Sequence, residues 1–527
     1  MKKIAAIISL FLSFFAFAEE YKIVSVDYEI DGSTRLYAME TKVPIDLKKK
    51  FQSEEELITY IEDVKKQLEN TRTFDEVDYS YEIEESDDGE TLGVKLLIKT
   101  KDSLHFIGTP YPKYKSGDSL SLLLKVKDTN FLGSMETLTA DLNFGIELDD
   151  DDKAEEYKFG FNADFDTPFK LSAMDAVWGN NLSFSYTIGD SSPEWNYKTG
   201  LSLVLPFNKF SLVWAFDQSF VRNFDYKGEW KGEGDNREYF DYGDDTYFIE
   251  SFKFSVPITI QEVKNWGKIL YTPYTKVTYN WDFDGISKDN EDLLGPSMEF
   301  GQTISTARIN WIENFRNGID VSITQSFEYN FNDYNFNPGI SGEFKAYKTF
   351  GWMGFCTDIY AYAYMNGNGS FGDRMRGIRP DQYYDIDDLE NVDPEIAFLK
   401  PCKSAAAIII NMDFPIKICR IYWDTIPVIK KIKVAKYFNL EAQISPFIDI
   451  ALFKNEAMNS TFNPKDGFIS GGIEGIIYPL RWKGIQVRGS LGVDLTRKMP
   501  KLKGKVNQDW RSSCKSYEIS IGIGLHY

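Results

Sequence analysis

Strict two-residue alternation of apolar and polar side chains is the feature that most constrains the fold of this chain. The clearest run is SYEISIGIGLHY at the C-terminus. One face of it carries Tyr517, Ile519, Ile521, Ile523, Leu525 and Tyr527, and the other carries Glu518, Ser520, Gly522, Gly524 and His526. The pattern recurs in TLTADLNFGIEL, YKFGFNADF, NLSFSYTIG, VTYNWDFDG and IDVSITQSFEYNF. Because successive side chains of a β-strand point to opposite faces, these runs predict strands with one apolar face.

Two architectures share this pattern, a soluble β-sandwich and a transmembrane β-barrel. The runs have about the 9–11 residues that a tilted strand needs to cross a bilayer. Phe, Trp and Tyr make up 16% of the chain although its mean hydropathy is −0.34, and short connections alternate with long polar ones. Together these features favour an antiparallel transmembrane barrel, whose aromatic residues gather at the membrane interfaces.

The N-terminal sequence MKKIAAIISLFLSFFAFA has the pattern of a secretory signal peptide. Lys2 and Lys3 precede an apolar run, and Ala16-Phe17-Ala18 supplies the small residues of a cleavage site. The alternative is a membrane anchor, but the apolar run is too short to span a bilayer. We therefore expect residues 1–18 to be removed and the mature chain to be exported.

Charge and histidine content argue against two function classes. A formal net charge of −21 makes nucleic acid an unexpected partner. The sequence holds two histidines, His105 and His526, and neither lies in a catalytic or metal-binding motif, so we do not expect an enzyme. The acidic runs at 243–245 and 385–388 lack the ligand spacing of a calcium loop, and we interpret them as solvated loop charge. No cofactor is expected.

The four cysteines leave two interpretations open. Cys356, Cys402, Cys419 and Cys514 show no metal-ligand spacing. In an exported chain they could form two disulfides, with Cys402 and Cys419 on adjacent strands, or remain four buried thiols.

Residues 21–102 differ from the alternating part of the chain and predict a small α+β domain. YKIVSVDYEIDG reads as a strand, and FDEVDYSYEIEE and TLGVKLLIKT as two more. Between the first and the second of these strands, an apolar row recurs at helical spacing: Leu57, Ile61, Val64 and Leu68. Ser53 with Glu56 forms a capping box at its start. The order is therefore strand, helical region, strand, strand.

Longer motifs carry a more specific resemblance. VDYEIDGSTR and QLENTRTFDEVDYSYEI lie in the N-terminal domain, and TPYPKYKSGDSLSLLLKVKDTNFLGS follows it. RMRGIRP, AAAIIINMDFPIKI and ISPFIDIALF lie nearer the C-terminus. In these motifs the chain resembles the BamA/TamA superfamily of outer-membrane assembly and translocation proteins. The likeness is thin between about 150 and 350.

The resemblance implies a mainly β fold, a 16-stranded transmembrane antiparallel β-barrel preceded by a small α+β POTRA-like (polypeptide-transport-associated) domain. The POTRA-like domain would span 21–102 in the periplasm, a linker 103–117, and the outer-membrane barrel 118–527. The C-terminal strand Tyr517 to Tyr527 would be the recognition signal for assembly, and it would close the barrel against a first strand at about 119–128.

A loop held in the barrel lumen is also implied by the resemblance. Arg376 would be the lumenal arginine and Gly377 would permit a tight loop tip, with Asp413 and Asp449 as acidic partners on the wall. A guanidinium bridging two carboxylates would fix the loop as a latch. The alternative is that Arg374, Arg376 and Arg379 only offset local acid on an exposed loop. The chain departs from the family in two ways. Ile378 stands where an aromatic residue is usual, and one POTRA-like domain is evident where the family's general assembly factor usually carries several.

The function implied is assembly, insertion or translocation of client proteins at the outer membrane. A client strand would add to the exposed sheet edges of the POTRA-like domain. It would also add to a barrel seam weakened by Gly522 and Gly524, although these glycines could simply relieve crowding in the lumen. Partners would be outer-membrane lipid, unfolded client proteins and, where present, periplasmic chaperones or accessory lipoproteins. The alternative is a passive pore or transporter of solutes or lipids, with a reduced periplasmic domain and a cation-selective acidic lumen lined by Asp141, Glu147, Asp282, Asp320 and Glu518.

Overall fold

The computed structural model describes residues 20–523 except 86–90, 116–118, 149–153, 190–191, 225–227, 232–237, 291–292, 294, 333, 378–402, 433, 456–459, 466 and 496–516. The expected signal peptide, Arg379, Gly524, Leu525 and Tyr527 lie outside these residues, as do Cys402, Cys514 and the acidic run 385–388. Two compact units emerge, an N-terminal unit of Met1–His105 with Thr129–Met135 and a barrel unit of Phe106–Asp128 with Glu136–Tyr527.

The N-terminal unit packs two helices on a four-stranded sheet. The strands β1 (Glu20–Asp31), β2 (Lys50–Phe51), β3 (Phe74–Glu85) and β4 (Thr91–Asp102) lie in the order β2-β1-β4-β3. The central pair β1 and β4 is parallel and the other two pairs are antiparallel. The helices are α2 (Leu36–Lys42) and α3 (Glu54–Asn70), which fill the connection between β1 and β3.

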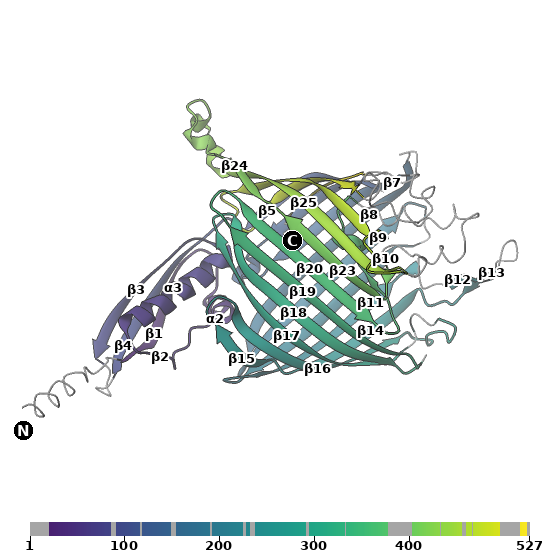
Figure 1. Ribbon diagram of the computed structural model, residues 1–527, viewed down its shortest axis with the longest axis horizontal. Coiled ribbons are helices and arrows are strands. Elements are labelled where there is room, and N and C mark those ends of the chain that lie inside the picture. The colour runs from purple at the N-terminus through teal and green to yellow at the C-terminus, as the bar shows by residue number, and fades with distance from the viewer. Residues whose placement is uncertain are drawn as a thin grey trace, which may run out of the picture. The chain divides into compact units, whose positions relative to one another are not determined.

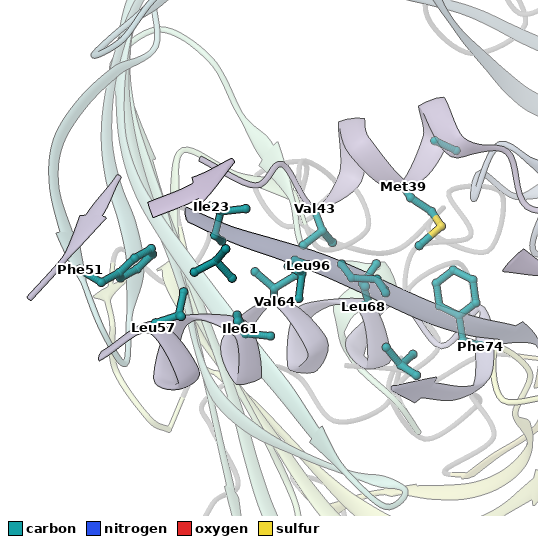
Figure 2. Close-up of a cluster of buried hydrophobic side chains, with 14 of the residues drawn as sticks. Ile23, Met39, Val43, Phe51, Leu57, Ile61, Val64, Leu68, Phe74 and Leu96 are labelled. Carbon is teal, nitrogen blue, oxygen red and sulfur yellow. The ribbon is translucent and has the colours of Figure 1, made fainter. Parts of the chain in front are cut away.

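Helix α3 forms where the capping box predicts it. Ser53 Oγ accepts the N–H of Glu56 at 3.2 Å, and the Glu56 carboxylate accepts the N–H of Gln52, one residue before the cap. The predicted apolar row is buried, and Figure 2 shows it facing the sheet: Leu57, Ile61, Val64 and Leu68 with Ile23, Phe51 and Leu96. Sequence periodicity therefore located both this helix and its core face.

A short segment from beyond the expected domain boundary completes the N-terminal unit. Asn130 is fully buried and donates to Thr34 Oγ1 at 2.8 Å and to Asp102 at 3.3 Å, while its side-chain oxygen accepts from the N–H of Met135. Met135 belongs to the buried core. Gly133 has φ 72, and a Cβ there would collide with the carbonyl oxygen of Ser33. The expected domain, 21–102, is thus incomplete as a structural unit.

The barrel unit is one closed antiparallel ring of strands (Figure 1). Its first half contains β5 (Phe106–Lys115), β6 (Ser119–Asp128), β7 (Leu138–Leu148), β8 (Ala154–Leu171), β9 (Met174–Thr187), β10 (Glu194–Pro206), β11 (Ser211–Arg222), β14 (Thr246–Ser255), β15 (Ile258–Val263) and β16 (Gly267–Trp281). Its second half contains β17 (Ser297–Ile312), β18 (Phe315–Asn330), β19 (Phe336–Thr349), β20 (Gly354–Tyr364), β23 (Ala406–Asp413), β24 (Ile416–Ile421), β25 (Leu440–Asn455), β26 (Ser460–Thr461), β27 (Phe468–Pro479), β28 (Val487–Asp494) and β29 (Tyr517–Ile523).

The expected count of sixteen strands is not confirmed. Among the described residues, twenty-one strands form the ring, and three consecutive pairs (β14 with β15, β23 with β24, β26 with β27) each lie along one shared neighbour. Counting each pair as one pass leaves eighteen passes. Pro257 and Pro415 stand at two of these breaks, where they remove ladder donors.

The expected linker, 103–117, and the expected first barrel strand are corrected by the structure. Residues 106–115 form β5, which pairs with β6 along its length, and β5 rather than 119–128 is the ring neighbour of β29. Trp482 Nε1 also donates to Phe106 O at 3.0 Å, which ties β5 to the turn before β28. The linker was implied by the family resemblance, and Pro110 and Pro112 also weaken a strand prediction for these residues.

The two faces of the ring differ in chemistry. Exposed apolar residues are cross-strand neighbours on the outer face, in rows such as Leu122, Phe144 and Phe159, or Ile473, Leu491 and Ile519. On the opposite face, polar side chains bond across strands, as Thr303 does with Thr324 at 2.9 Å. No helix among the described residues is both long and apolar enough to cross a membrane.

The ring also has two different ends, because consecutive strands alternate in direction. One end, the short-turn end, holds the start of β5 and the connections 129–137, 172–173, 207–210, 264–266, 313–314, 350–353, 422–439 and 480–486. The other, the long-loop end, holds 223–245, 282–296, 365–405, 456–467 and 495–516 among its connections. The strands β12 (Gly228–Lys231), β13 (Glu238–Asp241), β21 (Gly369–Ser370) and β22 (Lys403–Ser404) lie within these long loops.

Candidate functional site

Two adjacent strands supply the wall of the candidate site. Burial alternates along β23, so that Asn411 and Asp413 lie on its buried face. Asn411 is the cross-strand partner of Asp449 on β25, and Asp413 is the partner of Phe447. Since cross-strand partners share a face, both carboxylates point to the inside of the ring.

Arg376 lies between these two carboxylates. Its Nε and Nη2 donate to the two oxygens of Asp449 at 2.9 and 2.7 Å, and Nη1 and Nη2 donate to the two oxygens of Asp413 at 2.8 and 3.2 Å. Its backbone N–H also donates to Asp449 at 3.1 Å. Arg376 is 5% exposed. Both hydrogen-bonding edges of the guanidinium are therefore used, which fixes the orientation of the side chain as well as its position.

The surroundings extend this ion pair into a buried network. The guanidinium of Arg376 stacks on the ring of Phe447 with its carbon 3.7 Å from the ring centroid. The carboxylate of Glu474, on β27, is 4.0 Å from Arg376 Nη1 and 3.2 Å from Arg488 Nη1. Buried charges are tolerated only when they are paired and hydrogen-bonded, and this network meets that condition for Arg376.

The residues before Arg376 fasten the loop to a neighbouring part of the wall. Arg374 Nη1 donates to Glu343 at 2.8 Å. The guanidinium of Arg374 stacks on Tyr360, with its carbon 3.9 Å from the ring centroid. Asn411 donates its side-chain N–H to the carbonyl of Arg374 at 2.8 Å. These contacts hold the loop by its backbone as well as by its charges.

An apolar cluster packs the same loop against the ring. Phe371 and Met375 are buried with residues from β20, β23, β25 and β27: Tyr362, Ala407, Ile409, Ala451, Phe453 and Phe468. The ring centroids of Phe371 and Phe453 are 5.0 Å apart. Most of residues 371–377 are therefore packed, although Asp373 is exposed and Arg374 only partly buried, and the exposed-loop alternative for Arg374 and Arg376 does not describe this structure.

Gly377 brings the loop tip against the backbone of β28. It has φ 76, and a Cβ there would lie 2.5 Å from Val493 N. A Cβ at Gly492 would in turn lie 2.7 Å from Gly377 N. The Gly377 N–H donates at 2.8 Å to the carboxylate of Glu518, whose cross-strand partner on β28 is Gly492. Two glycines thus permit a close backbone approach, and the absent side chain at Gly492 leaves Glu518 room to reach the loop.

Sequence reasoning missed part of this arrangement. Glu518 was recognised as lumenal but not as a partner of the loop, and Asn411, Glu474, Arg488 and Gly492 were not singled out. Gly492 and Glu518 could have been identified only from the register of β28 and β29. The long connection between these two strands makes that register unpredictable from the sequence. Asn411 carried a usable signal, because it lies two residues before Asp413 on the same face of one strand.

The terminal strand is only partly described. Tyr517, Ile519 and Ile521 are exposed, and Glu518 and Ser520 lie on the opposite face. Ile523 belongs to β29. A Cβ at Gly522 would meet Arg488 Nε at an ordinary 3.7 Å, so crowding inside the ring does not require a glycine at this position.

Other sequence candidates have different surroundings from those expected. Asp244 is buried and accepts from Ser287 N and from Asn290, and Asp245 pairs with Arg222, so the acidic run 243–245 ties loops together and is not solvated charge. No cluster of potential metal ligands occurs among the described residues. Cys356 is buried and Cys419 is exposed.

One of the two histidines approaches a serine in the N-terminal unit. Ser33 Oγ is 3.2 Å from His105 Nε2, but Asp102 binds the Ser33 and Thr34 groups. A triad would need the acid on the second ring nitrogen of the histidine.

Comparison with known proteins finds similar solved structures but no relative that matches by sequence. No protein family matches the sequence, and no curated protein is similar to it. CdiB from Acinetobacter baumannii is 10% identical, with 95% of this chain and 73% of that chain covered and a TM-score of 0.48. CdiB from Escherichia coli is 9% identical, covering 96% and 77%, with a TM-score of 0.45. BamA from Haemophilus ducreyi lacking POTRA domains 1–3 is 12% identical, covering 96% and 85%, with a TM-score of 0.34.

Proposed function

We propose that this chain is an outer-membrane barrel protein that assembles, inserts or translocates client polypeptides. The proposed device is a closed ring whose lumen holds a latched loop and whose terminal strand is tied to that loop. The N-terminal unit acts as a periplasmic POTRA-like domain, and no covalent chemistry is involved.

The membrane placement is supported by the outer face of the ring. Its apolar side chains run in continuous cross-strand rows, although the whole chain is polar on average. Large contiguous apolar surfaces are rare on monomers in water, whereas an outward apolar band is the defining surface of a transmembrane barrel. The short-turn end would face the periplasm, because periplasmic turns of such barrels are short and this end carries the connection to the N-terminal unit.

The observation that carries the proposal is the double attachment of the loop tip. Arg376 binds β23 and β25 through Asp413 and Asp449, and the adjacent Gly377 binds β29 through Glu518. One dipeptide therefore joins the interior wall to the last strand of the ring. A passive pore has no need to connect its loop to its closing strand, whereas a barrel that opens along that strand does.

The strand that meets β29 is poorly suited to a strong seam. Pro110 and Pro112 of β5 carry no backbone N–H, and they are two residues apart, so both missing donors belong to the same edge of the strand. An edge with few donors is easier to separate and to pair with an incoming strand. The sheet of the N-terminal unit offers a further edge in β3, which pairs only with β4 among the described strands.

The test is depletion of the protein followed by quantitative mass spectrometry of the outer-membrane fraction. A broad fall in other barrel proteins supports general insertion, and loss of one or a few exported proteins supports a dedicated translocase. An unchanged outer-membrane proteome with altered solute uptake overturns the proposal and favours the passive pore. The polar inner face of the ring is the observation that keeps the pore as the second candidate.

A further inference from the structure

The connection between β24 and β25 is unlike the other connections at the short-turn end. It covers residues 422–439, whereas most neighbouring turns, such as 172–173, 264–266 and 313–314, are a few residues long. It contains three short 3-10 helices, η7 (Trp423–Thr425), η8 (Ile429–Lys431) and η9 (Ala435–Phe438). Figure 1 shows this segment standing away from the ring beside β24. We call residues 422–439 the rim segment.

The base of the rim segment is firmly built. Asn439 is buried, accepts from Trp423 N at 2.8 Å and donates to Asp424 at 3.0 Å. Its carbonyl accepts from Leu480 N at 2.8 Å, which fastens the base to the neighbouring turn. The segment is thus an ordered projection whose two ends are closed by one asparagine.

The outer part of the rim segment exposes large apolar side chains. Val428 is 80% exposed and Phe438 is 63% exposed, and Tyr422, Ile432 and Val434 are also exposed. Large apolar side chains gathered on a projecting segment are unfavourable in water, and such patches mark sites that contact a partner or a membrane. It continues the outer apolar face of the ring, because Ile418 on β24 and Ile444 on β25 are exposed at the strand ends that lead into the segment.

The same segment is strongly basic in an acidic chain. It contains Lys430, Lys431, Lys433 and Lys436 and a single acidic residue, Asp424, whereas the whole chain has a formal net charge of −21. Lys430, Lys431 and Lys436 are exposed. Basic residues interleaved with bulky apolar and aromatic ones are the composition of segments that lie at the surface of an anionic bilayer.

We propose that the rim segment is an interfacial anchor that binds anionic phospholipid headgroups at the short-turn end of the barrel. Its apolar side chains would enter the headgroup boundary while its lysines contact lipid phosphates. The inference rests on the membrane placement proposed above but not on client assembly. A lipid surface fits better than an acidic protein, because the segment begins where the outward apolar strands end and would therefore lie at bilayer depth.

The test uses the full chain in nanodiscs, which leave both membrane faces accessible. An environment-sensitive fluorophore is attached to Val428→Cys in a background with the four native cysteines changed to serine. Quenching by nitroxide-labelled lipid and by acrylamide in water is compared between phosphatidylcholine and phosphatidylcholine–phosphatidylglycerol nanodiscs. We expect the anionic lipid to increase nitroxide quenching and to decrease acrylamide quenching. Lys430→Gln with Lys431→Gln should lower the bound-to-free ratio of the segment by about 30-fold.

Two control probes separate failure of the anchor from failure of the membrane placement. A probe at Ala173→Cys, in the short turn 172–173, should not respond to lipid charge, because the nearby Lys170 is already paired with Asp175. A probe at Ile323→Cys, on the outer face of β18, should be quenched by nitroxide lipid in both nanodiscs, because it reports insertion of the ring. A failure at Ile323 overturns the membrane placement itself.

A second measurement needs no substitution. Trypsin cleavage after Lys430 or Lys431 in the unmodified chain should be slower in anionic nanodiscs than in neutral ones. Equal cleavage and equal acrylamide access in both, with the Ile323 probe inserted, overturn the anchor. Protection that appears only in native envelopes and not in nanodiscs of either lipid also overturns it and indicates a protein partner.

Discussion

At the scale of single residues, the site depends on the shape of one side chain. Arg376 offers a planar fork with several donors, and the structure uses it against two carboxylates while an aromatic ring covers its face. A lysine would bring the same charge but a single ammonium group, which cannot bridge both carboxylates with this geometry. The resemblance to a known family pointed to Arg376, Asp413 and Asp449, because their motifs are local in sequence. Glu518 was not implied as a partner of the loop, and its contact with Gly377, 141 positions away, depends on the register of β28 and β29.

We therefore expect Arg376→Lys to destabilise the protein despite conserving charge. Removing one partner of a buried ion pair costs on the order of 3–5 kcal/mol, and the lysine should recover only part of this. Urea unfolding in detergent, followed by intrinsic fluorescence, measures the loss. Arg374→Lys is the matched comparison, since Arg374 is more exposed and should cost less. Equal, small losses for both variants would contradict the latch.

At the scale of secondary-structure elements, glycine determines where the loop can touch the wall. Gly377 and Gly492 lie backbone to backbone, so the approach is closer than side chains allow. The inward and outward faces of the strands were predictable from alternation alone. The strand count of sixteen came from the resemblance, which assigned the residues of β5 to a linker, and eighteen passes remain in the described part of the ring even when the divided strands are counted once.

The glycine contact gives a prediction with a control in the same strand. Gly492→Ala would place a Cβ 2.7 Å from the Gly377 backbone, which cannot yield cheaply, and we expect a loss of about 1–3 kcal/mol from overpacking. Gly489→Ala, also on β28, places a Cβ 3.9 Å from its neighbours and should be nearly silent. Thermal unfolding of the two variants, side by side, tests this. If they behave alike, the loop tip does not press on β28.

The bond from Gly377 to Glu518 predicts an effect confined to the last strand. Glu518→Ala removes the acceptor, and a hydrogen bond to a charged group contributes about 1.5–3 kcal/mol. Amide hydrogen exchange in β29 should therefore accelerate by roughly 10- to 100-fold, while β17 on another part of the ring should not change. Glu518→Gln keeps an oxygen acceptor and should fall between the two. Uniform acceleration across the ring would indicate general destabilisation and not release of the seam.

At the scale of the whole molecule, the loop inside the ring should govern conductance. A lumen partly filled by residues 371–377 predicts small, unsteady single-channel currents in planar bilayers. Arg376→Ala should increase both the conductance and the time spent open, because the loop loses its attachment to β23 and β25. Large, steady channels from the unmodified chain would favour the passive pore.

The segment Thr129–Met135 has a consequence for how the chain can be divided and made. The chain passes between the two units three times, after His105, before Thr129 and after Met135. The smaller unit is therefore built from two separate segments of the chain. A fragment that stops at the first crossing lacks Asn130 and Met135, and it leaves the Asp102 carboxylate without one of its donors. The N-terminal unit can therefore reach its final packing only after the chain has been made as far as Met135, and that length includes β5 and β6. Completion of the small unit thus requires that the residues of the first two barrel strands are already part of the chain.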